Sequence, residues 1–190
     1  MTTWMLFDYG EVICLPQPAG AMAAMAAMAG CDGDAFHDRY WSHRDAFDRG
    51  LASHLYWSGV LDRDLEPGDP IVTRLEDADI ASWSHLNPAS MDMLGDLAGS
   101  HRLALLSNAP EPIAAAIDAA PWASAFDHRF YSCRLSLAKP DPAIFESVLE
   151  RLGADPADVT FLDDRAVNVD AAAGLGINAV LYRPPGHAEH

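Results

Sequence analysis

The 190-residue sequence has little cysteine and little positive charge, and each shortage excludes a class of protein. The three cysteines are odd in number and lack CxxC spacing, which argues against a disulfide framework and against a zinc site. Only 12 lysines and arginines oppose 28 aspartates and glutamates, so the formal net charge is −16. A field of that sign repels phosphate backbones and anionic bilayers, and we expect neither nucleic acid nor a membrane as a partner.

Long apolar runs are also missing. The apolar stretch at residues 19–29 is too short to span a bilayer, and the first four residues lack the basic region of a signal peptide. We therefore expect a cytoplasmic protein with reduced thiols. Because 50% of the residues are hydrophobic, the chain can still bury the core of one compact domain that carries a small inserted subdomain.

Short apolar runs, typical of buried parallel strands, open the chain and recur in its second half. They cover residues 4–8, 103–108, 159–164 and 177–182, with a weaker candidate at 126–133. Helical patterns lie between them at residues 111–120, 142–152 and 165–175. This alternation predicts a doubly wound, Rossmann-like α/β fold with a parallel sheet, which binds ligands at the carboxyl ends of its strands.

Residues 15–86 interrupt the alternation. No strong strand signal falls there, and successive helical segments with glycine stops predict an all-α subdomain inserted after the first strand. We expect an α/β core made of residues 1–14 and 87–190, with residues 15–86 as a helical cap. Within the cap, Asp34 is expected to begin a helix that continues through residues 36–49.

Polar residues follow the predicted strands at the points where the strands end. Asp8 follows the first strand, Ser107 and Asn108 end the second, and the pair Asp163 and Asp164 ends a later one. Since parallel strands end at one edge of a sheet, we expect these side chains to lie together. Acidic groups brought together there repel one another unless a cation lies among them.

The sequence around these residues resembles the haloacid dehalogenase (HAD) superfamily, in its phosphatase-like branch with a helical cap inserted after the first strand. Four motifs match in order, at residues 7–12, 105–108, 139–145 and 161–168. The resemblance implies that Asp8 is a nucleophile that forms an aspartyl-phosphate. It also implies a Mg²⁺ ion held by Asp8, the Gly10 carbonyl and Asp164, with Asp163 close by or bound through water.

The resemblance implies further roles around the phosphate. Ser107 and the backbone amides near Asn108 would bind its non-bridging oxygens. Lys139, the only lysine in the chain, would assist catalysis by neutralising the charge shared with Asp8. Asn168 would orient the acidic loop. From the cap we expect the helix at residues 36–49, with Tyr40, Trp41, His43, Arg44 and Arg49, to provide the surface that contacts the leaving group, although Arg44 has Asp45 and Asp48 as alternative partners.

Gly10 departs from the pattern, since many phosphatases of this superfamily carry there a second aspartate that acts as general acid and base. Such a group contributes about 10²- to 10⁴-fold to the rate.

We expect a Mg²⁺-dependent phosphatase acting on a small phosphorylated metabolite, with a sugar phosphate as the first candidate. The alternatives are a 2-haloacid dehalogenase, against which the Asp163–Asp164 pair argues, and a weak or inactive HAD-fold binding or regulatory protein. The sequence decides neither the substrate nor the oligomeric state.

Overall fold

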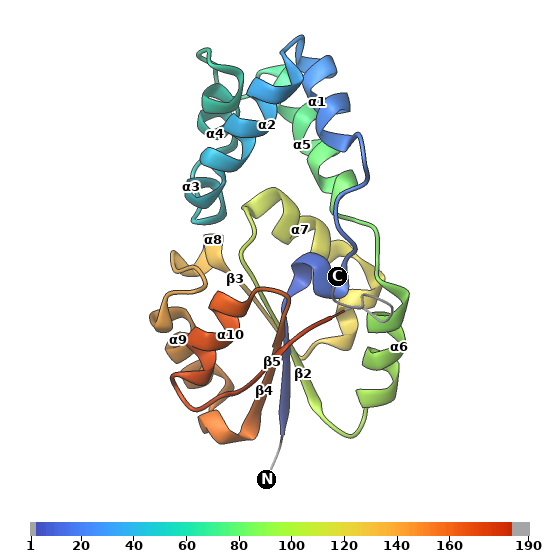
Figure 1. Cartoon of the computed structure of the whole chain (residues 1–190), viewed down its shortest axis with the longest axis vertical. Coiled ribbons are helices and arrows are strands. Elements are labelled where there is room, and N and C mark those ends of the chain that lie inside the picture. Colours follow the sequence, from blue (N-terminus) through green and yellow to red (C-terminus); the bar gives the residue numbers. More distant parts are fainter. Residues whose placement is uncertain (1–2, 184–190) are drawn as a thin grey trace.

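A five-stranded parallel sheet forms the centre of the computed structural model, which describes residues 3–183 (Figure 1). The strands lie in the order β3-β2-β1-β4-β5, so β1 occupies the middle and pairs with both β2 and β4. Their bounds are Trp4–Phe7 for β1, Arg102–Ser107 for β2, His128–Tyr131 for β3, Val159–Asp163 for β4 and Asn178–Leu181 for β5. The predicted doubly wound α/β fold is confirmed.

The inner strands are apolar along their length because both faces of the sheet are covered. Successive side chains of a strand point to opposite faces. Leu103 and Leu105 of β2 therefore pack into one core layer, while Ala104 and Leu106 pack into the other. A strand that is covered on both faces therefore reads as a continuous apolar run, as β2 does up to Ser107 at its end.

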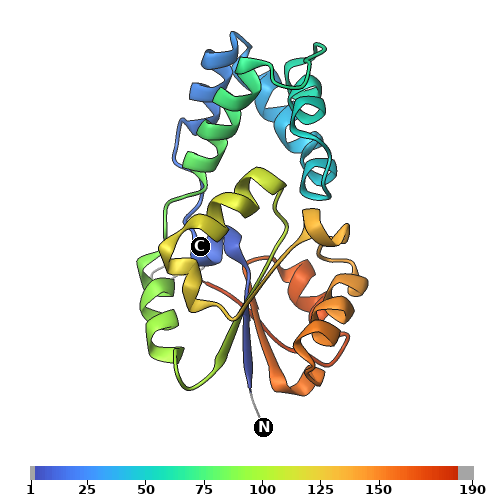
Figure 2. The same ribbon diagram turned by 180° about the vertical axis from the view of Figure 1, so that it is seen from behind.

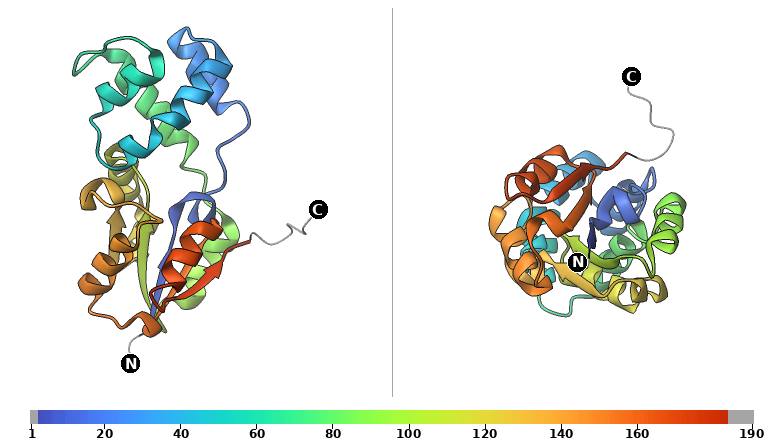
Figure 3. Two further views of the ribbon diagram at one scale, coloured as in Figure 1. Left: turned by 60° about the vertical axis from the view of Figure 1, so that its left-hand side comes forward. Right: turned by 90° about the horizontal axis from the view of Figure 1, so that it is seen from below.

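Helices that follow residue 87 supply both layers, and Figure 3 shows them flanking the sheet when the molecule is seen from below. One layer contains α6 (Pro88–Leu97) and α7 (Glu111–Ala119). The other contains α9 (Pro142–Leu152) and α10 (Ala166–Ala173). Short segments complete the core at η1 (Tyr9–Ile13), η2 (Pro121–Ala125), α8 (Ser132–Leu135) and η3 (Pro156–Asp158).

The five α-helices between η1 and α6 form a separate bundle above the carboxyl edge of the sheet (Figures 1 and 2). They are α1 (Ala21–Ala29), α2 (Gly33–Ser42), α3 (Arg44–Asp48), α4 (Ser53–Leu61) and α5 (Pro70–Ser82). We call this bundle the cap. It has an aromatic core of its own, in which the rings of Phe47 and Tyr56 stack with centroids 4.1 Å apart.

The expected single helix over residues 36–49 is wrong, because the chain breaks at His43 into α2 and α3. The His43 ring lies about 3.0 Å from the position that a side chain on Gly59 would take, so the turn at His43 packs closely against α4. The prediction that Asp34 caps the start of this helix is also wrong. The side chain of Asp32 accepts the Ala35 N–H at 3.0 Å, which places Asp34 in the first turn.

Two chain segments connect the cap to the core, and they run side by side. Cys14 and Leu86 form an antiparallel bridge. The Leu15 N–H donates to the His85 carbonyl at 2.7 Å on one side of it, and the Asn87 N–H donates to Ile13 at 2.9 Å on the other. We call residues 13–15 and 85–87 the hinge pair. None of the helices between residues 3 and 183 combines the length and apolar character needed to cross a bilayer.

The packing predicts a large penalty for truncating Phe145, a buried residue of α9 whose ring meets Phe161 edge to face at 5.3 Å. We expect Phe145→Ala to lower the free energy of unfolding by about 3–5 kcal/mol, measured by urea denaturation. The control is Val167→Ala on α10, because Val167 is 48% exposed. That variant should change stability by no more than about 0.5 kcal/mol. Equal losses in the two variants would contradict this account of the core.

Candidate active site

Three carboxylates meet where β1 and β4 end. Asp8 follows β1 directly, and its N–H donates to the Leu162 carbonyl at 2.9 Å, which continues the pairing of the two strands. Asp163 is the last residue of β4, and Asp164 follows it. One oxygen from each of Asp8, Asp163 and Asp164 lies within 4.8 Å of the others. The parallel register therefore brings together the acidic residues that the sequence separates by more than half of the chain.

Lys139 lies between two of these carboxylates. Its Nζ is 2.7 Å from Asp8 Oδ1 and 2.7 Å from Asp163 Oδ2, and it donates to the Leu106 carbonyl at 3.1 Å. The residue is only 3% exposed. Burial on its own lowers the pKa of Lys139, but the two carboxylates outweigh burial and raise the pKa above its ordinary value. The ammonium therefore stays charged.

Asp163 is fully buried, and its oxygens are occupied by donors. Besides Lys139, it accepts two hydrogen bonds from Asn168 Nδ2, at 2.9 and 3.0 Å, and one from the Arg165 N–H at 2.8 Å. Asn168 thus orients the acidic loop, in agreement with its expected role. Asp163 in turn fixes the position of the lysine ammonium.

Asp8 and Asp164 line a cavity between the cap and the core. Burial raises the pKa of Asp8 to about 7; Lys139 opposes this rise, and the charges of Asp163 and Asp164 add to it. Burial, followed by the charges of Asp163 and Glu11, raises the pKa of Asp164 to about 6. The single positive charge of Lys139 does not neutralise the three neighbouring carboxylates. An all-oxygen donor set with excess negative charge fits a hard divalent cation such as Mg²⁺.

The loop after β2 forms the neighbouring wall. Asn108 lines the cavity, and its side chain holds the Lys139 backbone through two hydrogen bonds, accepting from the N–H at 2.9 Å and donating to the carbonyl at 2.8 Å. Ser107 ends β2 and is only 3% exposed, and the cavity lining does not include it. Asn108 and Lys139 therefore line the same cavity as Asp8, whereas Ser107 does not, and its contact with phosphate stays a prediction.

The cavity has a volume of about 630 Å³, and the cap forms its roof. Four residues of α2 and α3 line it opposite Asp8 and Gly10, namely Trp41, Arg44, Asp45 and Asp48, together with Trp83, which directly follows α5. The two tryptophans meet edge to face, with ring centroids 6.5 Å apart. A leaving group in this space would meet both aromatic surface and charged groups.

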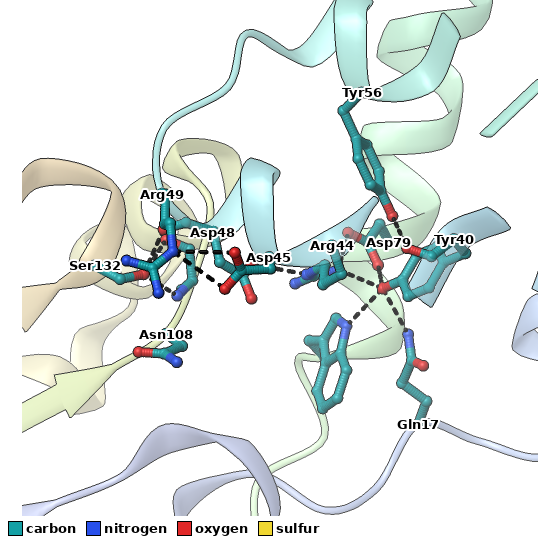
Figure 4. Close-up of polar contacts among 12 residues, drawn as sticks. Gln17, Tyr40, Arg44, Asp45, Asp48, Arg49, Tyr56, Asp79, Asn108 and Ser132 are labelled. Atoms are coloured by element: carbon teal, nitrogen blue, oxygen red, sulfur yellow. Dashed lines mark hydrogen bonds and ion pairs between the residues drawn. The ribbon is translucent and has the colours of Figure 1, made fainter. Parts of the chain in front are cut away.

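Arg44 is held by partners within the cap (Figure 4). Its Nε donates to Asp48 Oδ1 at 2.8 Å, and its Nη1 donates to the Tyr40 hydroxyl at 2.5 Å and to Asp79 Oδ2 at 3.3 Å. Burial lowers the pKa of Arg44, but Asp48, Tyr40 and Asp79 raise it well above its ordinary value. Of the two alternative partners expected for Arg44, Asp48 forms an ion pair with it. The other, Asp45, pairs instead with Arg49 at 3.1 Å. Arg44 still lines the cavity.

Trp41, one of the cap residues expected to contact the leaving group, lines the cavity, whereas sequence reasoning missed Asp79 and Trp83. Trp83 lies just after α5, where its carbonyl accepts the Tyr9 hydroxyl at 2.5 Å and its indole N–H donates to Tyr40 at 3.2 Å. The only sequence signal for Asp79 was an acidic residue within a helical pattern. Asp79 and Trp83 contact residues that are more than 30 positions away in the chain, so no short sequence motif indicates these contacts.

A sequence profile described as haloacid dehalogenase-like hydrolase matches residues 4–176. The chain therefore belongs to the HAD-like hydrolases, as the four motifs predicted.

Several curated relatives match over short stretches. Bifunctional epoxide hydrolase 2 of Sus scrofa is 41% identical over 58 residues, which are 30% of this chain and 10% of that protein. Flavin mononucleotide hydrolase 1 of Arabidopsis thaliana is 38% identical over 28% of this chain and 22% of its own length. (S)-2-haloacid dehalogenase 4A of Burkholderia cepacia is 33% identical over 45% of this chain and 37% of its own length. The chain thus spans well under two thirds of each of these relatives.

Solved structures agree over the whole chain. A HAD family enzyme of Bacteroides thetaiotaomicron, crystallised with magnesium and inorganic phosphate, superposes with a TM-score of 0.78 at 20% identity, covering 100% of this chain and 98% of that one. A 2-haloacid dehalogenase of Pseudomonas syringae superposes with a TM-score of 0.72 at 19% identity, covering 99% and 89%. At these identities the likeness shows the shared fold.

The raised carboxyl pKa values predict how the stability of the chelator-treated protein depends on pH. Because Asp8 and Asp164 hold protons in the folded state at a pH where the unfolded chain has lost them, the free energy of unfolding should fall between about pH 4.5 and about pH 7.5. Asp164→Asn should reduce this fall by on the order of 1 kcal/mol, allowing for the partial exposure of Asp164. Urea titrations in EDTA measure it, with exposed Asp155→Asn as the control. A variant less stable than wild type at the higher pH would contradict the repulsion.

Proposed function

We propose that the protein is a Mg²⁺-dependent phosphatase that hydrolyses a small phosphorylated metabolite, a sugar phosphate being the first candidate, through an aspartyl-phosphate on Asp8. The free thiols of Cys14, Cys31 and Cys133 fit a cytoplasmic location. The proposal rests on the group of Asp8, Asp163, Asp164 and Lys139 at the carboxyl edge of the sheet.

Asp8 is suited to act as the nucleophile. The raised pKa of Asp8 belongs to the metal-free site, and a divalent cation beside it would favour the ionised form. A carboxylate then needs no base to remove a proton before it attacks, in contrast to a serine hydroxyl. Its Oδ1 is held by Lys139 and also accepts the Tyr9 N–H at 2.7 Å, which leaves Oδ2 for attack on phosphorus. Attack would break the bond from phosphorus to the leaving oxygen and form a mixed anhydride. Water would then cleave this anhydride, releasing phosphate and restoring the carboxylate.

The residues around Asp8 would stabilise the charge that gathers during the transfer. The Lys139 ammonium is already fixed against Asp8 and needs no rearrangement to act on a bound phosphate. The backbone beside Asn108 is held by the Asn108–Lys139 contacts, so it would present its amides in a fixed position. Arg44 would contact the leaving group from the cap.

Asp8, Asp164 and the Gly10 carbonyl would hold the Mg²⁺ ion. When bound, the ion would offset the repulsion between the nucleophile and the phosphate dianion. Asn168 supports this assignment, because its Oδ1 is buried without a hydrogen-bond partner in the part of the chain that the structure describes. An unpaired acceptor beside the acidic loop fits a site that holds water molecules.

The acidic pair favours phosphoryl transfer over halide displacement. Halide displacement from a 2-haloacid uses a carboxylate nucleophile without a metal. A second carboxylate beside it, such as Asp164, would then only repel the substrate's own carboxylate. Two of the similar proteins are 2-haloacid dehalogenases, so halide displacement is the alternative reaction. Release of phosphate or of chloride distinguishes the two reactions.

We expect phosphate release from p-nitrophenyl phosphate that requires Mg²⁺ and that falls about a thousandfold or more in Asp8→Asn, because the nucleophile is lost. The matched control is Asp92→Asn, which changes an exposed aspartate on α6 and should keep full activity. Equal turnover by Asp8→Asn and wild type would remove Asp8 as the nucleophile. Chloride release from 2-chloropropionate without metal would instead assign the protein to halide displacement.

The position of Gly10 allows the missing acid to be restored. The residue has φ −62° and ψ 127°, which any amino acid adopts, and a Cβ placed on it has nothing within 4 Å. We expect Gly10→Asp to speed hydrolysis of alkyl phosphates by about tenfold or more, because their leaving oxygens need protonation, and to affect p-nitrophenyl phosphate less.

Gly10→Asn is the control for this change, since it adds a side chain of the same shape without an ionisable proton. Steady-state rates with glycerol 3-phosphate and with p-nitrophenyl phosphate would be compared. If both variants act alike, the side chain at position 10 does not serve as the acid.

A further inference from the structure

The cap contacts the core on opposite sides of the cavity. On one side lies the hinge pair of residues 13–15 and 85–87. On the other side α3 lies above α8, as both Figure 1 and its reverse view in Figure 2 show. The second contact joins two segments that are far apart in the sequence. The packing of α5 against α7 also joins distant segments. The α3–α8 contact is nevertheless a place where a movement of the cap would act on the core.

Ser132 makes this second contact. It is fully buried at the start of α8, and its hydroxyl donates to the carbonyl of Asp48, the last residue of α3, at 2.5 Å. The same oxygen accepts the N–H of Ala109 at 3.0 Å. A hydroxyl has one proton, and the Ala109 carbonyl at 3.5 Å is a much poorer acceptor for it than Asp48. One buried side chain thus joins the cap to the loop after β2.

On the cap side, the contact reaches the residues that face the substrate. The Asp48 carboxylate holds Arg44 at 2.8 Å, and Arg44 is tied to Asp79 of α5 and to Tyr40 of α2. Figure 4 shows Ser132, Asp48, Arg44 and Tyr40 following one another across the cap–core boundary. Since α3 is fastened to α2 and α5 in this way, it moves with the cap.

On the core side, the contact reaches the catalytic lysine. Ala109 follows Asn108, whose side chain makes two hydrogen bonds to the Lys139 backbone. The Lys139 ammonium then contacts Asp8 and Asp163 at 2.7 Å each. A displacement of the Ala109 peptide would therefore change the loop that holds both the phosphate-facing amides and the lysine.

We propose that Ser132 is a positioning residue that couples cap closure to the phosphate loop, so that the site reaches its working geometry only when α3 is seated on α8. The kinetic part of this proposal rests on the proposed phosphatase function. The coupling itself is a property of the fold and is measurable without any substrate.

Gly50 offers a way to unseat α3 without touching Ser132 or any residue of the site. It lies just after α3 with φ +100°, and a Cβ on it would lie 3.1 Å from the Cys133 carbonyl of α8. Gly68 is a matched control in the same cap, because it has φ +87° and nothing within 4 Å of an added Cβ. Gly50→Ala and Gly68→Ala therefore carry similar backbone strain, but only the first disturbs the contact with the core.

Amide hydrogen exchange at Ala109, followed by NMR on the full chain, tests the coupling. We expect exchange about tenfold faster in Gly50→Ala and in Ser132→Ala than in wild type, and within about twofold of wild type in Gly68→Ala. Faster exchange in Ser132→Ala alone would mean only that the amide lost its acceptor. If Ala109 in Gly50→Ala stays as protected as in wild type, the coupling is refuted.

Kinetics with p-nitrophenyl phosphate and Mg²⁺ give the functional readout. Gly50→Ala should lose about tenfold in kcat/KM, with the loss falling on kcat, because the loop and Lys139 act on charge that develops during transfer. A loss confined to KM, or none, would overturn the positioning role. A wild-type protein that releases no phosphate would refute the proposed function, while the exchange measurement would still decide the coupling.

Discussion

The Lys139 ammonium is the interaction on which the site depends, because it holds together the ends of three strands. It joins the carboxylate that follows β1, the carbonyl of Leu106 in β2 and the last residue of β4. A buried cation needs such partners, since its charge is costly to remove from water and is stabilised only when its donors are satisfied. The parallel sheet supplies all three at one edge.

The three carboxylates have different tasks as a result. Asp163 uses both oxygens on Lys139, Asn168 and the Arg165 amide, and so it is part of the framework. Asp8 and Asp164 remain directed at the cavity, where their charges repel each other. A site built in this way has its charged groups fixed in place and keeps an excess of negative charge that a divalent cation would offset.

The α/β core and the acidic edge could be predicted from the sequence because both depend on local pattern. Buried strands are apolar runs, and the polar residues that end them must meet at the same edge of a parallel sheet. The surroundings of Arg44 could not be predicted in the same way, since Asp79 comes 35 residues later and joins it only through the packing of α3 on α5. The break at His43 and the contact of Ser132 with Asp48 depend on packing of the same kind.

The hinge pair has a consequence for how such a protein diversifies. The chain leaves the core at Cys14 and re-enters it at Leu86, and these two residues lie side by side, so both covalent connections to the bundle meet the core at one place. An insertion with closely spaced ends can be exchanged, shortened or elaborated while the strands keep their order and register. The bundle of α1 to α5 could therefore be replaced as one unit, while the residues at the carboxyl edge of the sheet beneath it would keep their positions.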